Sequence, residues 1–361
     1  MSRDTLSDLL RSVRLRGAAF YYVSCRDQWS AAAPPGREIA AVFMPGADHV
    51  MEYHMVAKGT GWAAVSGLPP VRVSTGDLVL FPQGDAHVLS SAPALRGELQ
   101  GKEWLLAMRE APKPIPITYH GGIVQPGAAL PVEDAETVLV CGFLSCDLRP
   151  FNPLCAALPR ILHLPAARAG EWVARVIDQA VAESVERRPG GDAVLERLSE
   201  MMFVDAVRRY VDSMPEESSG WLAGLRDGVV GRALALLHGQ PGAPWTLDRL
   251  GKEVGLSRSA LHERFVHLIG QPPMQYLTQW RMQVASNLLV TTTAKVASIA
   301  LDVGYDSEAA FARAFKRATG QPPATWRRGH ATGVGTRRLR KPSGEARLPA
   351  PPGVDGRLAG R

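Results

Sequence analysis

Two stretches near the C-terminus share one pattern: LDRLGKEVGLSRSALHERFVHLIGQPP at residues 247–273 and IALDVGYDSEAAFARAFKRATGQPP at residues 299–323. The segment FVHLIGQPP, from Phe265, recurs as FKRATGQPP, from Phe315. Each copy reads as a helix, a glycine turn, a second helix and a Gly-Gln-Pro-Pro stop. A repeat of this kind indicates one supersecondary unit used twice.

The first copy contains the residues that a tight helix–turn–helix needs. Gly255 can take the left-handed conformation that ends a helix, and Ser257 can cap the helix that follows. Leu261 and Phe265 then face the core of the unit, and Gly251 keeps a small side chain where the helices cross. The second copy has the following counterparts: Gly304 at the turn, Asp306 or Ser307 as the cap, Phe311 and Phe315 in the core, and Ala300 at the crossing.

The charge of the chain is divided unevenly. Residues 221–361 contain 20 Lys and Arg against nine Asp and Glu, whereas the whole 361-residue chain has a net charge of only +6. A basic module that binds a polyanion, joined to a mildly acidic one, explains this division. A solvated basic tail at 329–361 explains only part of it.

These residues resemble the AraC/XylS-type DNA-binding domain over about residues 227–328. The resemblance implies seven helices, with PPMQYLTQWRMQVASNLLVTT joining the two units. It also implies a regulator of transcription that places two recognition helices in adjacent major grooves, about 34 Å apart. The sequence alone leaves open a plain helical bundle that contacts only proteins.

Matching positions assign DNA contacts to single residues. The expected base contacts are Ser259, His262 and Glu263 in the first unit and Glu308, Ala309 and Arg313 in the second. Arg313 suits a bidentate contact to guanine, and Glu263 suits cytosine N4. The expected phosphate contacts, which position the protein without specifying sequence, are Arg258, Arg264, Arg281, Lys316 and Arg317.

The N-terminal half has a different texture, because residues 16–165 are rich in Gly, Pro and β-branched residues with short extended runs. Its His54, followed by Gly76-Asp77 and Pro82-x-Gly84-x-x-His87, resembles the cupin barrel found in many AraC-type regulators. Enzymatic cupins usually carry an H-x-H pair with a glutamate after it, and residues 55–58 break that pattern. A metal-dependent cupin enzyme with a DNA-binding appendage is therefore the alternative, and we expect no enzyme.

Cys25 and Cys141 are predicted to lie in an early and a late strand of this barrel. Together with His54 and His87 they form a candidate zinc site, because two Cys and two His suit Zn²⁺. The two cysteines alone would suit oxidant sensing by a disulfide, as in the reactive-chlorine-responsive cupin regulators that this region resembles. Other interpretations remain open. The cysteines could be inert packing residues, and the histidines could be hydrogen-bonded residues of the barrel or could line an effector pocket without metal. Cys146 and Cys155 are expected to be structural.

The predicted fold is α+β with two domains: an N-terminal cupin-like antiparallel β-barrel with a helical hairpin, and a C-terminal all-α double helix-turn-helix. The predicted boundaries are residues 1–165 for the barrel, 166–220 for the hairpin and linker, 221–328 for the DNA-binding domain and 329–361 for a basic disordered tail.

The expected partners are double-stranded DNA, RNA polymerase, an effector that is a small molecule or an oxidant, and a second copy of the chain through the stripe from Leu195 to Tyr210. No segment is apolar enough for a membrane, and we expect a cytoplasmic regulator of transcription, with activator and repressor both left open by the sequence.

Overall fold

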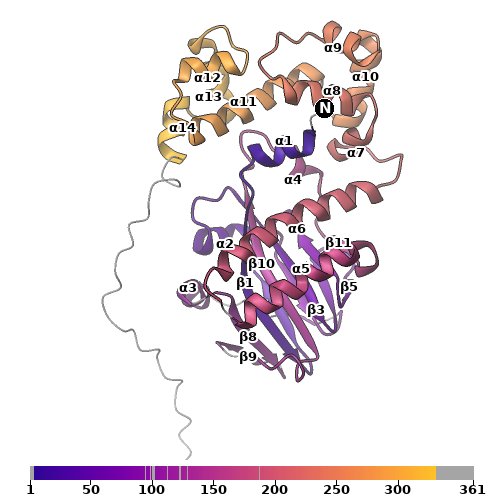
Figure 1. Cartoon of the computed structure of the whole chain (residues 1–361), viewed down its shortest axis with the longest axis vertical. Coiled ribbons are helices and arrows are strands. Elements are labelled where there is room, and N and C mark those ends of the chain that lie inside the picture. Colours follow the sequence, from indigo (N-terminus) through magenta and orange to yellow (C-terminus); the bar gives the residue numbers. More distant parts are fainter. Residues whose placement is uncertain are drawn as a thin grey trace, which may run out of the picture.

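The computed structural model describes residues 4–93, 95–97, 99, 102–111, 113–121, 123–127, 129–186 and 188–330. A sheet-rich part forms one end of the molecule and a helical part forms the other (Figure 1). The two-domain α+β prediction is confirmed, and the predicted tail lies, from residue 331 on, outside the described residues.

The larger sheet has seven strands in the order β11–β6–β3–β10–β1–β8–β9. Their bounds are β1 Arg16–Arg26, β3 His49–Lys58, β6 Leu78–Phe81, β8 Ile115–His120, β9 Ile123–Pro126, β10 Thr137–Cys146 and β11 Leu162–Leu164. Every residue of β10 is buried, because this central strand is covered on both faces.

A second sheet has the order β2–β7–β4–β5. Its strands are β2 Ser30–Ala33, β4 Thr60–Val65, β5 Val71–Ser74 and β7 His87–Ser90. The predicted antiparallel barrel is corrected in two respects. The two sheets do not close into one hydrogen-bonded ring, and β1 runs parallel to β8. Val23, Val56 and Phe81 belong to the core that includes side chains of both sheets.

Two long helices cover the outer face of the larger sheet (Figure 1): α5, Ala166–Glu186, and α6, Gly191–Ser213. Helix α6 packs against β1, and α5 packs against β3 and β10. The predicted stripe on α6 mostly faces inward, since Leu195, Met202 and Ala206 are buried. The hairpin therefore completes the core of the N-terminal part.

The helical part begins at α7. Its helices are α7 Trp221–Arg226, α8 Val230–Gly239, α9 Leu247–Val254, α10 Arg258–Ile269, α11 Pro273–Thr291, α12 Val296–Asp302, α13 Glu308–Thr319 and α14 Pro323–His330. The long helix α11 joins the two units, as expected. The core that contains Phe265 includes Tyr276 and Leu277 of α11, whereas the core that contains Phe311 and Phe315 includes Ala285 and Leu289, so the two cores lie toward opposite ends of this helix.

Four short helices complete the N-terminal part: α1 Thr5–Ser12, α2 Gly36–Phe43, α3 Lys102–Glu110 and α4 Pro153–Ala157. Two of them lie where the halves of the molecule meet. Helix α1 packs against α8 and α11, and α4 packs against α7. Leu6 and Leu9 are buried there, as the amphipathic pattern of α1 requires. Among the described residues, no helix is long and apolar enough to span a bilayer.

Candidate functional site

The first helix-turn-helix unit is built by α9 and α10. The Ser257 hydroxyl accepts a hydrogen bond from the Ala260 N–H and caps α10, while Gly255, at φ 78°, ends α9. Only 2.8 Å would separate a Cβ on Gly251 from the carbonyl oxygen of Leu256, because the turn folds back tightly on α9. Leu261 is fully buried beneath this turn.

The second unit repeats the arrangement with α12 and α13. Gly304, at φ 84°, forms the turn, and the cap is Ser307 rather than Asp306. Its hydroxyl accepts from the Ala310 N–H at 3.2 Å. Phe311 and Phe315 are fully buried, so one face of α13 is fixed against the core and the opposite face points to solvent.

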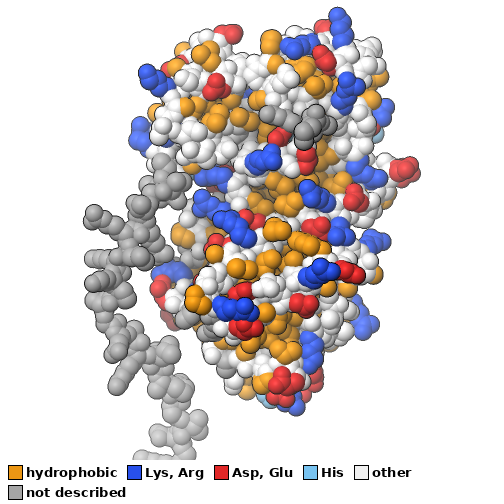
Figure 2. Space-filling model, viewed as in Figure 1, with side chains coloured by type: hydrophobic (Ala, Val, Ile, Leu, Met, Phe, Trp, Pro, Cys, Tyr) orange, Lys and Arg blue, Asp and Glu red, His pale blue; other side chains and the backbone are white. Residues whose placement is uncertain are grey.

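All six side chains expected to contact bases lie on the solvent-facing sides of the two second helices. They are exposed in every case: Ser259, His262 and Glu263 on α10, and Glu308, Ala309 and Arg313 on α13. Figure 2 shows Lys and Arg side chains along this outer end of the molecule. The surface can therefore meet DNA without rearrangement of its core.

The expected phosphate contacts divide into two groups. Arg258, Lys316 and Arg317 are exposed. Arg264 is also exposed, and its guanidinium binds the Asp227 carboxylate, with Nη2 at 2.6 Å from Oδ2. Arg281 differs, because its Nε and Nη2 donate to the carbonyl oxygens of Pro241 and Ala243 at 2.7 and 2.9 Å. Arg281 thus holds the loop before α9. This structural role stands in place of the phosphate contact that we expected.

A second candidate site lies between the two sheets. Glu52 and His54, two residues apart on β3, meet His87, which begins β7. One ligand atom from each of the three side chains lies within 4.8 Å of the other two. The ring atom His54 Nε2 is 2.8 Å from His87 Nε2, and the latter is 3.8 Å from Glu52 Oε2. Three possible metal ligands therefore converge.

Burial controls the charge of this group. It raises the pKa of Glu52 well above its ordinary value, and it lowers the pKa of His87 to about 4. Burial, with the charge of His87 in second place, lowers the pKa of His54 well below its ordinary value. Glu52 Oε1 and His54 Nδ1 are buried without a hydrogen-bond partner among the described residues. Such unsatisfied atoms are costly, and a cation bound by this group would satisfy the Glu52 carboxylate.

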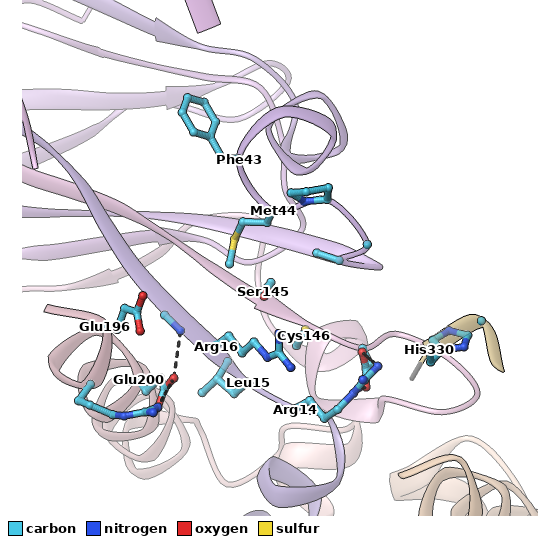
Figure 3. A pocket seen from close by; sticks show the side chains of 17 residues that line it. Arg14, Leu15, Arg16, Phe43, Met44, Ser145, Cys146, Glu196, Glu200 and His330 are labelled. Atoms are coloured by element: carbon cyan, nitrogen blue, oxygen red, sulfur yellow. Dashed lines mark hydrogen bonds and ion pairs between the residues drawn. The ribbon is translucent and has the colours of Figure 1, made fainter. Parts of the chain in front are cut away.

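The cavity beside these residues is small, at about 80 Å³, and Tyr21, Trp104 and Cys141 are among its lining residues. Pockets for drug-sized ligands usually occupy about 300–1,000 Å³. The space therefore suits an ion with one or two waters. A larger cavity of about 720 Å³ lies elsewhere, between β1, β10, α6 and the end of α14 (Figure 3).

The two cysteines expected in the sensor do not meet. In the antiparallel pairing of β1 with β10, Cys25 stands opposite Thr137 and Cys141 opposite Tyr21, four residues away. Four residues of strand are about 13 Å, beyond the limit of roughly 7 Å between the Cα atoms of a disulfide. A direct Cys25–Cys141 disulfide is thus excluded. Burial also raises the pKa of both thiols, which disfavours the reactive thiolate.

The zinc site expected from Cys25, His54, His87 and Cys141 is also revised. The convergent group contains both histidines but neither cysteine, and it adds Glu52. The sequence carried a signal for Glu52. It lies two residues before His54, which is the spacing of the two histidines in the cupin H-x-H pair, whereas the prediction rested only on the residues after His54. The pair Cys146 and Cys155, expected to be structural, is the one whose sulfurs are in contact, at 3.3 Å.

A cupin-like fold joined to two helix-turn-helix units, whose exposed faces carry polar and basic side chains, defines a class of protein: DNA-binding regulators of transcription with a cupin-type N-terminal domain.

Comparison with known proteins agrees with this class. A cupin family model matches residues 4–212, and a helix-turn-helix domain model matches residues 250–329. An AraC-like transcription regulator of Streptomyces lividans is 34% identical over 291 residues, which cover 78% of this chain and 88% of the relative.

Two further relatives cover most of the chain. The regulator AlkR of Acinetobacter baylyi is 26% identical, over 90% of this chain and 99% of its own length. The RCS-specific activator RclR of Escherichia coli is 30% identical, over 77% of this chain and 84% of its own length. The chain belongs to the AraC family of DNA-binding transcription regulators with a cupin-type N-terminal domain.

Proposed function

We propose that this regulator reads a specific operator with α10 and α13 in adjacent major grooves, and that the Glu52–His54–His87 group in the cupin pocket modulates its activity. The observation that carries the first half is the exposure of all six candidate base-reading side chains on two capped helices. Such helices present their N-terminal residues to base edges in the major groove.

A single substitution on α10 tests the DNA contact. The Glu263 carboxylate suits cytosine N4, whereas an amide in its place suits the N6 and N7 atoms of adenine. Glu263→Gln should therefore change the preferred base at one operator position. Glu253→Gln, an exposed change on α9, is the matched control and should leave the preference intact. Identical preferences in all three proteins would contradict the assignment of α10.

The second half of the proposal concerns a divalent transition metal such as Zn²⁺. His87 Nδ1 is 3.0 Å from the Asp85 carbonyl, so it carries the proton, and Nε2 keeps the lone pair that a metal needs. Two imidazoles and one carboxylate form a three-ligand set that leaves a coordination position open. When bound, the metal would supply a positive charge that keeps Glu52 ionised.

Metal analysis of the purified full-length protein tests this site. We expect nearly one metal ion per chain in the wild type and a loss of most of it in Glu52→Gln and His87→Gln. His120→Gln is the matched control, because His120 is exposed and pairs with Asp27, away from the cupin pocket. Equal metal content in all four proteins would exclude the site. Removal of the metal by a chelator is expected to change operator affinity.

A metal-dependent enzyme is the second candidate, because an open position on a two-His, one-carboxylate site is also what catalytic sites provide. The cavity of about 80 Å³ favours a sensor, since an organic substrate needs more room. The relative RclR is named as an RCS-specific activator. A small oxidant of a few atoms would fit the same space.

We further propose a cytoplasmic protein that contacts RNA polymerase and forms a homodimer through the hairpin. Most of the stripe on α6 is buried in the chain itself, but Val185, Val194 and Met201 remain 56%, 39% and 53% exposed on α5 and α6. A second subunit would cover them. Sedimentation of the full-length protein that shows only monomer at tens of micromolar would contradict the dimer.

A further inference from the structure

Two cysteines meet where the halves of the molecule join. Cys146 ends β10 and Cys155 lies in α4, and their Sγ atoms are 3.3 Å apart. Each residue is 3% exposed. The side-chain amide of Asn152 lies beside both sulfurs, with Nδ2 at 3.7 Å from the first and 3.4 Å from the second. The two cysteines are nine residues apart in the chain, so a bond between their sulfurs would close a short loop.

A cavity lies beside one cysteine of the pair. Cys146 lines the cavity of about 720 Å³, together with Arg14, Arg16, Glu200 and His330 (Figure 3). Residues from β1, β10, α6 and the end of α14 therefore surround a space beside Cys146. A small neutral oxidant that enters the cavity would lie next to Cys146, whose side chain is almost fully buried.

The segment between the two cysteines contacts the DNA-binding domain directly. The Phe151 N–H donates to Gln283 Oε1 on α11 at 3.0 Å. The Phe151 ring meets the Tyr276 ring edge-on, with centroids 5.3 Å apart. Gln283 in turn donates from Nε2 to the carbonyl oxygen of Ser12 at the end of α1. A change in this segment therefore changes the contact between the two halves.

We propose that Cys146 and Cys155 form a reversible disulfide when the protein meets a two-electron oxidant such as hydrogen peroxide, and that this modification alters the docking of the DNA-binding domain. One thiolate attacks a peroxide oxygen, the O–O bond breaks, and a sulfenic acid and hydroxide form; the hydroxide takes up the thiol's proton and leaves as water. The second sulfur then attacks the sulfenic sulfur, and its proton leaves with the displaced hydroxide as a second water. Two thiols and one peroxide thus give one disulfide and two waters.

The surroundings set the rate and the consequence of this step. The hydrogen bond with Cys155, followed by burial, raises the pKa of Cys146 well above its ordinary value, so the reaction is slow and needs sustained exposure. The sulfurs must approach from 3.3 Å to about 2.05 Å, which shifts them relative to the Asn152 amide that contacts both. The segment 147–154 then becomes a closed loop. Its conformations are restricted, so the position in which it holds Phe151 against α11 changes.

Peptide mapping after alkylation tests the proposal on the full-length protein, exposed to peroxide for minutes to hours. Cleavage before Asp147 separates the two cysteines, so a disulfide appears as a cross-linked peptide that a thiol reductant splits. We expect it in the wild type and in Cys25→Ala, whose cysteine is buried elsewhere. Cys146→Ser and Cys155→Ser should lack it, with Cys146→Ala and Cys155→Ala as replacements if a Ser variant fails to fold.

Operator affinity, measured on the same samples, tests the consequence. Oxidation should change it by threefold or more in the wild type and in Cys25→Ala, and reduction should restore it. The Cys146 and Cys155 variants should not respond. Free thiols at both positions after hours of exposure would overturn the proposal, as would a cross-link to another cysteine. A Cys146–Cys155 disulfide that leaves the affinity unchanged would overturn its effect on docking.

Discussion

Phe151 and Tyr276 join the two halves of the molecule, with their rings edge-on at 87° and their centroids 5.3 Å apart. The Tyr276 hydroxyl is fixed as well, since it accepts from Trp221 Nε1 at 2.8 Å and lies 2.7 Å from His238 Nε2. A loop of the N-terminal part thus packs on a rigid, hydrogen-bonded aromatic group in the core of the first DNA-binding unit.

Phe151→Ala should loosen this junction. The loss of a half-buried aromatic ring is expected to cost about 1–2 kcal/mol of docking free energy. Limited proteolysis in the connection at residues 214–220 should then speed up by about tenfold, while the cores of both halves unfold at nearly unchanged temperatures. Equal cleavage rates in wild type and variant would show that Phe151 does not hold the halves together.

The pH dependence of the metal-free protein should reveal the buried group in the cupin pocket. Both histidines have lowered pKa values in the folded state, so the unfolded state binds protons first and stability falls as pH drops below about 6.5. Glu52 has a raised pKa, so the folded state keeps a proton that the unfolded state releases above about 4.5, and stability falls as pH rises.

Below pH 6.5 the protons that the unfolded state gains at two histidines outnumber the proton that it loses at Glu52. Above pH 6.5 only Glu52 contributes to the pH dependence. The free energy of unfolding should therefore have a maximum near pH 6.5 and decline above it, by at most about 1.4 kcal/mol per pH unit. Urea unfolding of chelator-treated protein measures this profile. Glu52→Gln should abolish the decline above pH 6.5 but keep the acid limb. The same decline in wild type and Glu52→Gln would refute the assignment.

Gly251 offers a test of the packing in the first unit. Alanine is the better helix former by about 1 kcal/mol, but its Cβ would lie 2.8 Å from the Leu256 carbonyl oxygen. We expect the clash to prevail, so that Gly251→Ala destabilises the domain by about 1 kcal/mol. Ala300→Gly, at the matching position, should cost a similar amount by losing helix propensity. Thermal unfolding of both variants gives the answer, and a stabilised Gly251→Ala would contradict the geometry.

The sequence predicted local structure well, because caps and glycine turns act within a few residues. Gly255, Ser257, Gly304 and the buried pair Phe311 and Phe315 all have the predicted roles. Contacts between distant segments were harder to predict. Arg281 looked like a phosphate contact on a surface helix, yet the loop at 241–243 folds back to receive it.

The candidate sensor site shows the same limit. Strand register decides which cysteines meet, and a shift of four residues separates Cys25 from Cys141. Cys146 meets Cys155 because the chain turns back immediately after β10, which no spacing rule in the sequence signals. Glu52 was within reach of the sequence, since it stands two residues from His54 on the same face of β3.

Salt dependence should show how many phosphates the helical part neutralises. Arg258, Lys316 and Arg317 are exposed on the recognition helices. The logarithm of the operator affinity should fall with the logarithm of the salt concentration at about −0.9 per phosphate contacted. Lys316→Ala should reduce that slope by about one unit. A flat salt response of the wild type would contradict phosphate binding by this surface.

The central claim, that α13 reads bases and does not only bind the backbone, is tested most directly by binding-site selection with the full-length protein and two variants of that helix. Arg313 and Lys316 are both exposed and lie three residues apart. Arg313→Ala should relax the preference at one base pair by about 1–3 kcal/mol, whereas Lys316→Ala should weaken all sequences about equally. If the two variants select the same sites with the same loss of affinity, α13 does not read bases as proposed.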